Sequence, residues 1–457
     1  MFNRGIIKEV LSLALPAVGE MILYMMIWVL DTMMVGQYGG QVAVSTVGLS
    51  SEIMYTLSNI FIAYGISVGT VSLISRKLGA NERHSAEEYA TLGLLNGSIL
   101  SFLICFNAFI FAPKILYYAG ARSKILSQGI IYMKITSIGL FFNMLMNILN
   151  SILRGSKNTK IPLVASIIIN IVNIFLDWAL IFGKFGFPEL GIKGAAIATA
   201  ISHISGFTFI VFYTIKFSEI KPRFKYIQNL KMSKLKRLLK LSIPSSLQEA
   251  AFNLTRLLGT VMIMYIGGVA FAANQITTTI ESISFMPGSG FAIAATTLVG
   301  HKIGENKIHE AKHYAYVCTV LGTIIMMLCG LTFLLFPKFL ISLFINKSET
   351  DVINLGTICL TIASLEQTPM AISMILGGSL KGAGDTKTPF IVSLISSWLI
   401  RLPLMIYFIY LLKASVTYVW WITSIQWIID AIIMVILFKK RFNQLILKSD
   451  NKVQMTE

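Results

Sequence analysis

An acid and two amides interrupt the apolar run from Ile161 to Gly183: Asp177, Asn170 and Asn173. Asn173 and Asp177 are four residues apart, so they share one face of a helix. The run is long enough to cross a bilayer, and a carboxylate near the middle of such a helix costs roughly 2.5–3.5 kcal/mol even on a lenient insertion scale. That cost indicates a site facing the protein interior or an aqueous cavity, where an ion or a proton is handled.

The segment that holds these residues is one of many apolar segments. Hydrophobic residues make up 55% of the 457 residues and charged residues only 13%, against about a quarter in soluble proteins. We therefore expect an all-α polytopic membrane protein with twelve transmembrane helices, the first of which, Leu11 to Val35, is retained rather than cleaved. The expected spans centre near Leu23, Ile60, Leu100, Phe142, Val172, Ser205, Ala250, Phe285, Ile324, Ala363, Leu399 and Ala431.

The formal net charge of +17 is distributed unevenly along the chain. The two termini and the even-numbered connections carry about 27 Lys and Arg residues, and the odd-numbered connections carry about 8. Since such bases gather in cytoplasmic loops, we expect both termini in the cytoplasm and the chain in the cell membrane. This bias explains the charge without nucleic acid. The densest basic stretch, Lys216 to Lys240, is expected to contact anionic lipid.

The chain is an internal duplication. Matching segments recur at offsets of 228, 225 and 227 residues: Leu13–Pro16 with Leu241–Pro244, Leu78–Asn81 with Ile303–Asn306, and Leu153–Lys160 with Leu380–Lys387. Each half holds an even number of helices, about six, so the halves form a parallel repeat. We expect an N-terminal lobe over residues 1–230, a C-terminal lobe over 231–457, and substrate bound between the halves near the midplane.

Polar residues of the first half are missing from the second. The aligned positions are apolar: Asp31 falls on Gly259, Asn173 on Ile400 and Asp177 on Leu404. If packing of the duplicated scaffold required these polar groups, both halves should carry them. The difference therefore favours a function located in the N-terminal lobe.

Predicted depth brings four of these side chains to a common region. Asp31 and Asp177 lie about five and six residues from the outer ends of their helices, Thr199 lies at a similar depth, and Asn173 is one turn deeper. Two carboxylates, an amide and a hydroxyl suit a small hard cation, and the two acids could instead share a proton. The alternative is a structural hydrogen-bond cluster between helices.

Further charges lie within the predicted spans, in both halves. In the second half, two acids (Glu281 and Glu366) are balanced by two bases (Arg256 and Arg401). This balance favours structural ion pairs, and a role in gating or cation binding is the alternative. These candidate cavity or gating charges are Glu20, Glu52, Glu249, Arg256, Glu281, Glu366 and Arg401.

Motifs for other chemistry are lacking in the sequence. Gly382–Lys387 departs from the phosphate-loop pattern and follows no strand, and the histidines and cysteines lack metal-ligand spacing. No nucleophile and base fall at one depth. We expect no cofactor, no nucleotide, no enzymatic activity, and no metal beyond a possible sodium ion at the cation site, so transport must draw on an ion gradient.

Five stretches carry a family resemblance when taken together: Leu15–Pro16 with Val29–Gly36, Asn173–Gly183, Gly194–Thr199, Glu281–Gly288, and Lys381–Lys387. Along nearly its whole length the chain resembles the multidrug and toxic compound extrusion (MATE) family of secondary transporters. The resemblance implies a V-shaped pair of six-helix lobes and export of cationic amphipathic compounds, coupled to inward flow of sodium ions or protons. It also implies that Asp31, Asn173, Asp177 and Thr199 form the cation site.

We therefore expect a monomeric antiporter that works by alternating access on small cationic amphipathic drugs or metabolites in contact with membrane lipid. A flippase for lipid-linked saccharides is the alternative with a similar architecture. It should have a strongly cationic central cavity, whereas the first lobe's intramembrane charges are acids. A channel or a receptor would not need a duplicated pair of lobes with one acidic site.

Overall fold

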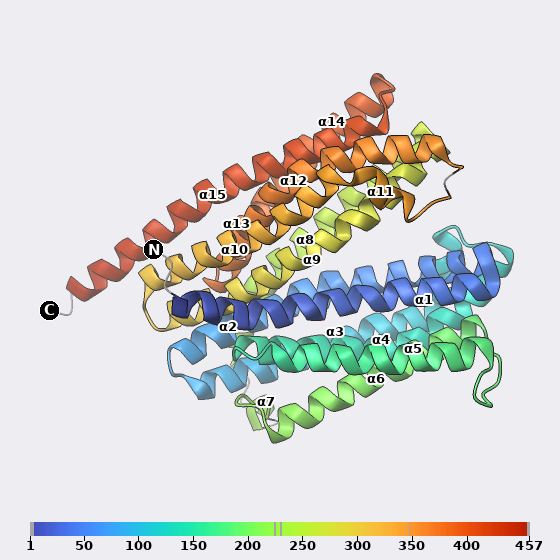
Figure 1. Ribbon diagram of the computed structural model, residues 1–457. Helices are drawn as coiled ribbons and strands as arrows, with labels where there is room; N and C mark the ends of the chain where they lie inside the picture. Colours follow the sequence, from blue (N-terminus) through green and yellow to red (C-terminus); the bar gives the residue numbers. More distant parts are fainter. Residues whose placement is uncertain (1–3, 224, 229–230, 347, 455–457) are drawn as a thin grey trace. The chain divides into compact units, whose positions relative to one another are not determined.

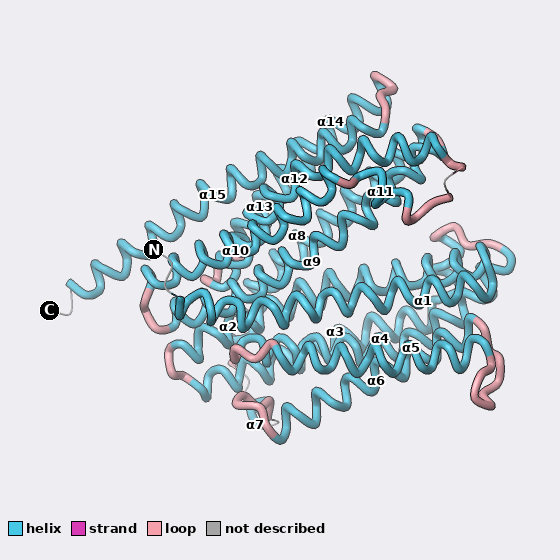
Figure 2. Tube along the Cα trace, viewed as in Figure 1, coloured by secondary structure: helices cyan, strands magenta, loops and turns pink. Residues whose placement is uncertain are grey.

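The computed structural model describes residues 4–223, 225–228, 231–346 and 348–454. These residues form helices joined by short turns, and no strand occurs among them (Figure 1, Figure 2). The expected all-α architecture is confirmed.

In the first half of the chain, a sharp bend separates two membrane-length segments. Gly40 has φ 57° and ψ −147°, a conformation that glycine adopts without the steric cost of a side chain. The bend divides Arg4–Gly40 from Val42–Gly79. The helices of this half are α1 (Arg4–Ser58), a π-helical turn (Asn59–Ile66), α2 (Ser67–Gly79), α3 (Arg83–Tyr118), α4 (Ser123–Gly155), α5 (Lys160–Phe182), α6 (Ile192–Lys216) and the short α7 (Lys225–Gln228).

The second half follows with a comparable run of helices. The eleventh of the twelve predicted spans, centred at Leu399, is one continuous helical segment over Lys387–Leu411 that alternates between α- and π-helical turns. The helices are α8 (Met232–Ile266), α9 (Gly268–Gly304), α10 (Ile308–Leu335), α11 (Pro337–Ser342), α12 (Thr350–Gly382), α13 (Lys387–Leu394), a π-helical turn (Ile395–Arg401), α14 (Leu402–Ile406), another (Tyr407–Leu411) and α15 (Val416–Gln454).

Eleven helical segments within the described residues are long and apolar enough to cross a membrane, and each contains the centre of a predicted span. The remaining predicted span, centred at Ala250, coincides with α8. That helix has 35 residues but does not meet the same standard of apolarity. Its first turns are rich in Lys and Arg, and Glu249 and Arg256 interrupt the apolar part that follows.

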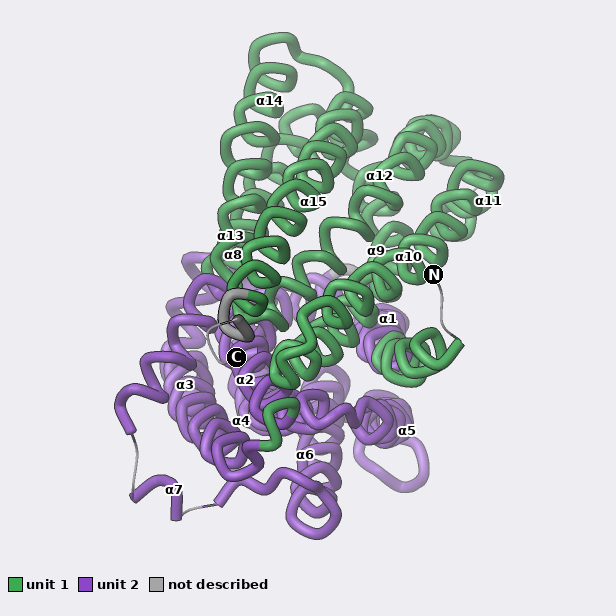
Figure 3. The backbone as a smooth tube through the Cα atoms, turned by 90° about the vertical axis from the view of Figure 1, so that its left-hand side faces the viewer, with its two compact units in different colours: residues 1–18, 79–81, 247–457 green, residues 19–78, 82–246 purple. Residues whose placement is uncertain are grey.

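The described residues divide into two compact units (Figure 3). Unit 1 takes in the described part of 1–18, 79–81 and 247–457, and unit 2 that of 19–78 and 82–246. Within unit 2, α4 packs against α3 and α6, and α6 packs against α5. Within unit 1, α12 packs against α9, α10 and α15.

A glycine sets the closest approach of α4 and α6 in unit 2. A Cβ atom at Gly139 would lie 2.5 Å from the Cα atom of Ala200. Helix backbones in membranes approach this closely only where both contact residues are small. Gly139 thus holds α4 against the helix that carries Thr199.

Gly139→Ala should lower the stability of the purified protein in detergent, because the added methyl group forces α4 and α6 apart. We expect a loss of about 1–3 kcal/mol, measured by thermal unfolding. Gly48→Ala is the matched control, since a Cβ atom there meets nothing within 4 Å. Equal destabilisation by both substitutions would contradict the packing argument.

Candidate functional site

Three helices of unit 2 bring the four predicted cation-site residues together. Asp31 lies on α1, Asn173 and Asp177 lie on α5, and Thr199 lies on α6. The α5 side chains at Asn170, Asn173 and Asp177 are buried at spacings of three and four residues, so one stripe of the helix faces the unit interior.

The four side chains are almost completely removed from the surface. Their exposed fractions are 7% for Asp31, 0% for Asn173, 1% for Asp177 and 4% for Thr199. The hydroxyl Oγ1 of Thr199 lies 3.3 Å from Oδ2 of Asp31 and 2.9 Å from the carbonyl oxygen of Ala195. Asp31 also interacts with the side chains of Asp177 and Asn173. The two acids are therefore neighbours.

Several polar atoms of this cluster lack a hydrogen bond of good geometry to any described residue. They are Oδ1 of Asp31, both carboxyl oxygens of Asp177 and both amide atoms of Asn173. Buried polar atoms are normally satisfied, so such a concentration of exceptions is typical of a site that binds something. Oxygen atoms of two acids and an amide can coordinate a small hard cation, or the two acids can hold a proton.

The corresponding region of unit 1 is packed with apolar side chains. A Cβ atom at Gly259, which aligns with Asp31, would lie 3.1 Å from the terminal methyl group of Met405. Leu404, which aligns with Asp177, packs against the apolar cluster that contains Met405 and Ile409. The second copy of the repeat therefore has methyl groups where the first has oxygen atoms.

Among the candidate gating charges, Glu20 forms an ion pair within unit 2. Its Oε1 accepts hydrogen bonds from Arg154 at 2.6 Å and from Asn150 at 3.3 Å. The side chains of Glu20 and Arg154 are only 5% and 11% exposed. Arg154 aligns with Lys381 at the repeat offset, and Lys381 lies near Glu249 in unit 1. Unit 1 therefore also has an acid near this base, although the residue aligned with Glu20 is Gln248.

The other charges of unit 1 form a second group. Glu281 interacts with Glu366, and both acids interact electrostatically with Arg401. Arg401 donates to Gln426 at 3.4 Å. Arg256 is exposed and acts on Glu249 and Arg401 through its charge, while Glu52 is an exposed residue of unit 2.

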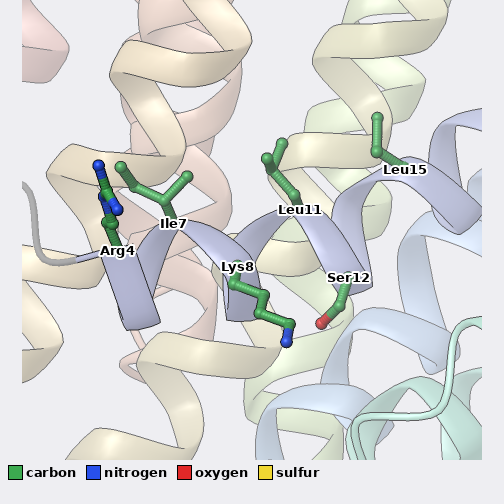
Figure 4. Close-up of a pocket in the computed structure, with 6 residues that line it drawn as sticks. All are labelled: Arg4, Ile7, Lys8, Leu11, Ser12 and Leu15. Atoms are coloured by element: carbon green, nitrogen blue, oxygen red, sulfur yellow. The ribbon is translucent and has the colours of Figure 1, made fainter.

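A shallow hollow of about 440 Å³ runs along the first turns of α1 in unit 1 (Figure 4). Its lining residues recur at spacings of three and four along a single helix face, and none belongs to the four-residue cluster. Two bases at its start disfavour a cation there. The lining residues are Arg4, Ile7, Lys8, Leu11, Ser12 and Leu15.

Sequence reasoning missed the surroundings of His203, one of the histidines that lack metal-ligand spacing. His203 lies one helical turn after Thr199 on α6 and contacts Tyr55 and Asn143. Two signals were present in the sequence: the spacing of four between Thr199 and His203, and asparagines at positions 143, 147 and 150 of one predicted helix. Neither signal identified the facing helix.

The MatE family model matches residues 16–179 and again residues 244–407. The two matches begin 228 residues apart, which is the offset at which the halves align. The chain is 32% identical over 400 residues to the probable multidrug resistance protein NorM of Thermotoga maritima, covering 87% of this chain and 84% of that protein. It is 27% identical over 393 residues to the uncharacterized transporter YisQ of Bacillus subtilis, covering 86% and 85%.

Solved structures share the fold at lower sequence identity. One is an outward-facing conformation of a multidrug resistance MATE family transporter, and another is a MOP superfamily transporter from Pyrococcus furiosus. Each has a TM-score of 0.89 and 20% identity, and each alignment covers 97% of this chain and 99% of that chain. At this identity the likeness concerns the fold alone.

Arg154→Met should destabilise the protein by about 3–5 kcal/mol, because it leaves the Glu20 carboxylate buried without its base. The double variant Glu20→Gln with Arg154→Met should recover most of that loss, since no buried charge remains. Thermal unfolding of the parent, both single variants and the double variant in detergent gives the coupling energy. A double variant less stable than Arg154→Met alone would argue against the ion pair.

Proposed function

This chain belongs to the MatE family of transporters, and on that premise we propose that it exports small cationic amphipathic compounds in exchange for sodium ions or protons. It is a multidrug efflux transporter that crosses the membrane many times. The names of its relatives describe transport of drugs in general. The class of compound and the coupling ion belong to the proposal.

The observation that supports ion coupling most strongly is the buried cluster in unit 2. Asp31 and Asp177 lie side by side with Asn173 and Thr199, and their exposed fractions are 7% or less. Two neighbouring acids in a membrane-spanning unit are costly unless a cation or a proton neutralises them. A site with this requirement converts an ion gradient into a difference in free energy between states of the protein.

Exchange follows if the cluster and the exported compound bind with opposite preferences. In an outward-open state, the cation enters and neutralises Asp31 and Asp177, which changes how α1, α5 and α6 pack. That change lowers affinity for the exported compound, which leaves, and the cation then departs inward. Linkage makes this coupling reciprocal, so the compound also weakens cation binding.

The proposed orientation rests on the distribution of bases. Lys and Arg residues gather at the termini and in the even-numbered connections, so both termini are assigned to the cytoplasm of a cell membrane protein. We assign the active form as a monomer, because one chain carries both halves of the repeat. No cofactor enters this scheme.

Asp177→Asn should abolish gradient-driven transport, since the site loses one of the two charges that attract the cation. At short range, one charge is worth enough to weaken cation affinity by at least about tenfold. The measurement is ethidium movement in proteoliposomes, first under an imposed sodium gradient and then under an imposed pH gradient. The gradient that drives transport by the parent protein identifies the coupling ion.

Asp430→Asn provides the matched control. Asp430 is a buried acid of unit 1 that accepts hydrogen bonds from Ser373 at 3.0 Å and from Ser396 at 3.3 Å. It should keep transport within about threefold of the parent level, because its hydroxyl partners tolerate an amide. If neither gradient moves dye with the parent protein, drug export is contradicted, and lipid flipping is the next activity to assay. If Asp177→Asn transports normally, the cluster is structural.

A further inference from the structure

A small cavity in unit 2 is lined by both Thr199 and His203. Its volume is about 10 Å³, close to the smallest that admits one water molecule. Its walls are largely apolar, but they include hydroxyl groups and one imidazole, which offer a water molecule hydrogen-bond partners. The lining residues are Ser51, Met54, Tyr55, Tyr132, Thr136, Leu140, Thr199 and His203, all of unit 2.

His203 connects this cavity to a row of amides on α4. Its Nε2 lies 3.0 Å from the hydroxyl oxygen of Tyr55, and its Nδ1 lies 3.2 Å from Nδ2 of Asn143. Asn147 Nδ2 in turn lies 3.0 Å from Oδ1 of Asn143. His203 and Asn143 are 2% and 1% exposed, so water does not compete with these contacts at the protein surface.

The contacts define the direction in which each group donates. Asn147 donates to Oδ1 of Asn143, so the amide nitrogen of Asn143 is the atom that faces His203. An amide nitrogen only donates, so Nδ1 of His203 accepts and the ring hydrogen lies on Nε2. That hydrogen points to the Tyr55 oxygen, which leaves the Tyr55 hydroxyl hydrogen free to point into the cavity.

Thr199 closes the chain on the other side of the cavity. Its one hydroxyl hydrogen has two acceptors, the Ala195 carbonyl oxygen at 2.9 Å and Asp31 Oδ2 at 3.3 Å. An ionised carboxylate attracts this hydrogen more strongly than a carbonyl group does. Once a cation neutralises Asp31, the carbonyl oxygen of Ala195 becomes the better acceptor.

We propose that the cavity binds one water molecule that links Tyr55 to Thr199, so that Asn147, Asn143, His203, Tyr55, water and Thr199 donate in sequence toward Asp31. Aligned donors polarise one another, and the whole chain stabilises the ionised form of Asp31. Tyr55 and His203 are then positioning residues that set the affinity of the cation site. This inference rests on the proposed function of the Asp31 and Asp177 pair.

The ionisable groups around this network come from α1, α4 and α5. All of them are carboxylic acids or phenols. Among the described residues around the network, His203 is therefore the only base. The hydrogen bond from Asn143 requires its neutral form, which carries no charge to repel a cation. The groups are Tyr24, Tyr55 and Asp31 on α1, Tyr132 on α4 and Asp177 on α5.

Tyr55→Phe deletes only the hydroxyl group that faces the cavity. It should lower the half-saturating concentration of the coupling cation about three- to tenfold, because the free carboxylate loses a donor while the cation-bound site does not. If the cation is a proton, the pH of half-maximal transport rises correspondingly. His203→Leu should act in the same direction, and His203→Gln should restore the parent value, since a glutamine side chain can accept from Asn143 and donate to Tyr55.

The assay is ethidium transport in proteoliposomes at varied sodium concentration or pH, together with sodium- and pH-dependent thermal unfolding of the purified protein. Ser202→Ala on the same helix is the control, because Ser202 is buried but bonds only to the Thr199 carbonyl oxygen among the contacts seen. Unchanged or increased half-saturation in both Tyr55→Phe and His203→Leu overturns the proposal. The unfolding measurement reports cation binding without transport, so a parent protein that binds cation but moves no dye counts against the proposed function alone.

Discussion

A carboxylate buried inside a membrane protein needs a partner that offsets its charge, and this constraint explains much of how each unit is built. Glu20 meets Arg154 across two helices of unit 2, and Asp430 is held by two serine hydroxyls in unit 1. Asp31 and Asp177 differ from these, because the described groups that contact them are each other, an amide and a hydroxyl. Glu20 and Asp430 thus have partners from the protein, whereas for Asp31 and Asp177 we propose that a bound cation or proton offsets the charge.

Duplication separates what the scaffold requires from what the function requires. The base near the end of α4, Arg154, recurs as Lys381 near the end of α12, so both copies retain a positive charge there, whereas Glu20 aligns with Gln248. The position of Asp31 became Gly259, against which Met405 packs. The polar groups at these aligned positions are thus confined to one copy of the repeat, which is why we propose the ion site in unit 2.

Much of the architecture was predictable, because membrane-length apolar runs and the cost of buried charge are properties of local sequence. The placement of Asn173 and Asp177 on one face of α5 follows from their spacing alone. The contacts of His203 did not, because the tyrosine at position 55 is 148 residues away and helical periodicity gives no information about which helices face each other. The break between the first two spans was predictable, because the first expected span ends at Val35 and the next centres at Ile60, and the structure places that break at Gly40.

The presence of two acids in one unit, with apolar counterparts in the other, also limits the energetics of exchange. Two carboxylates can neutralise at most two positive charges, so under the proposed mechanism the cluster binds at most two coupling charges in each cycle. Exchange of one univalent cation for one univalent drug is electroneutral and draws only on the concentration gradient. Exchange of two is electrogenic, and each net charge moved gains about 2.3 kcal/mol per 100 mV of membrane potential. The number of acids therefore sets an upper limit on the charge that this exchange moves, and with it on what the membrane potential adds to the concentration ratio.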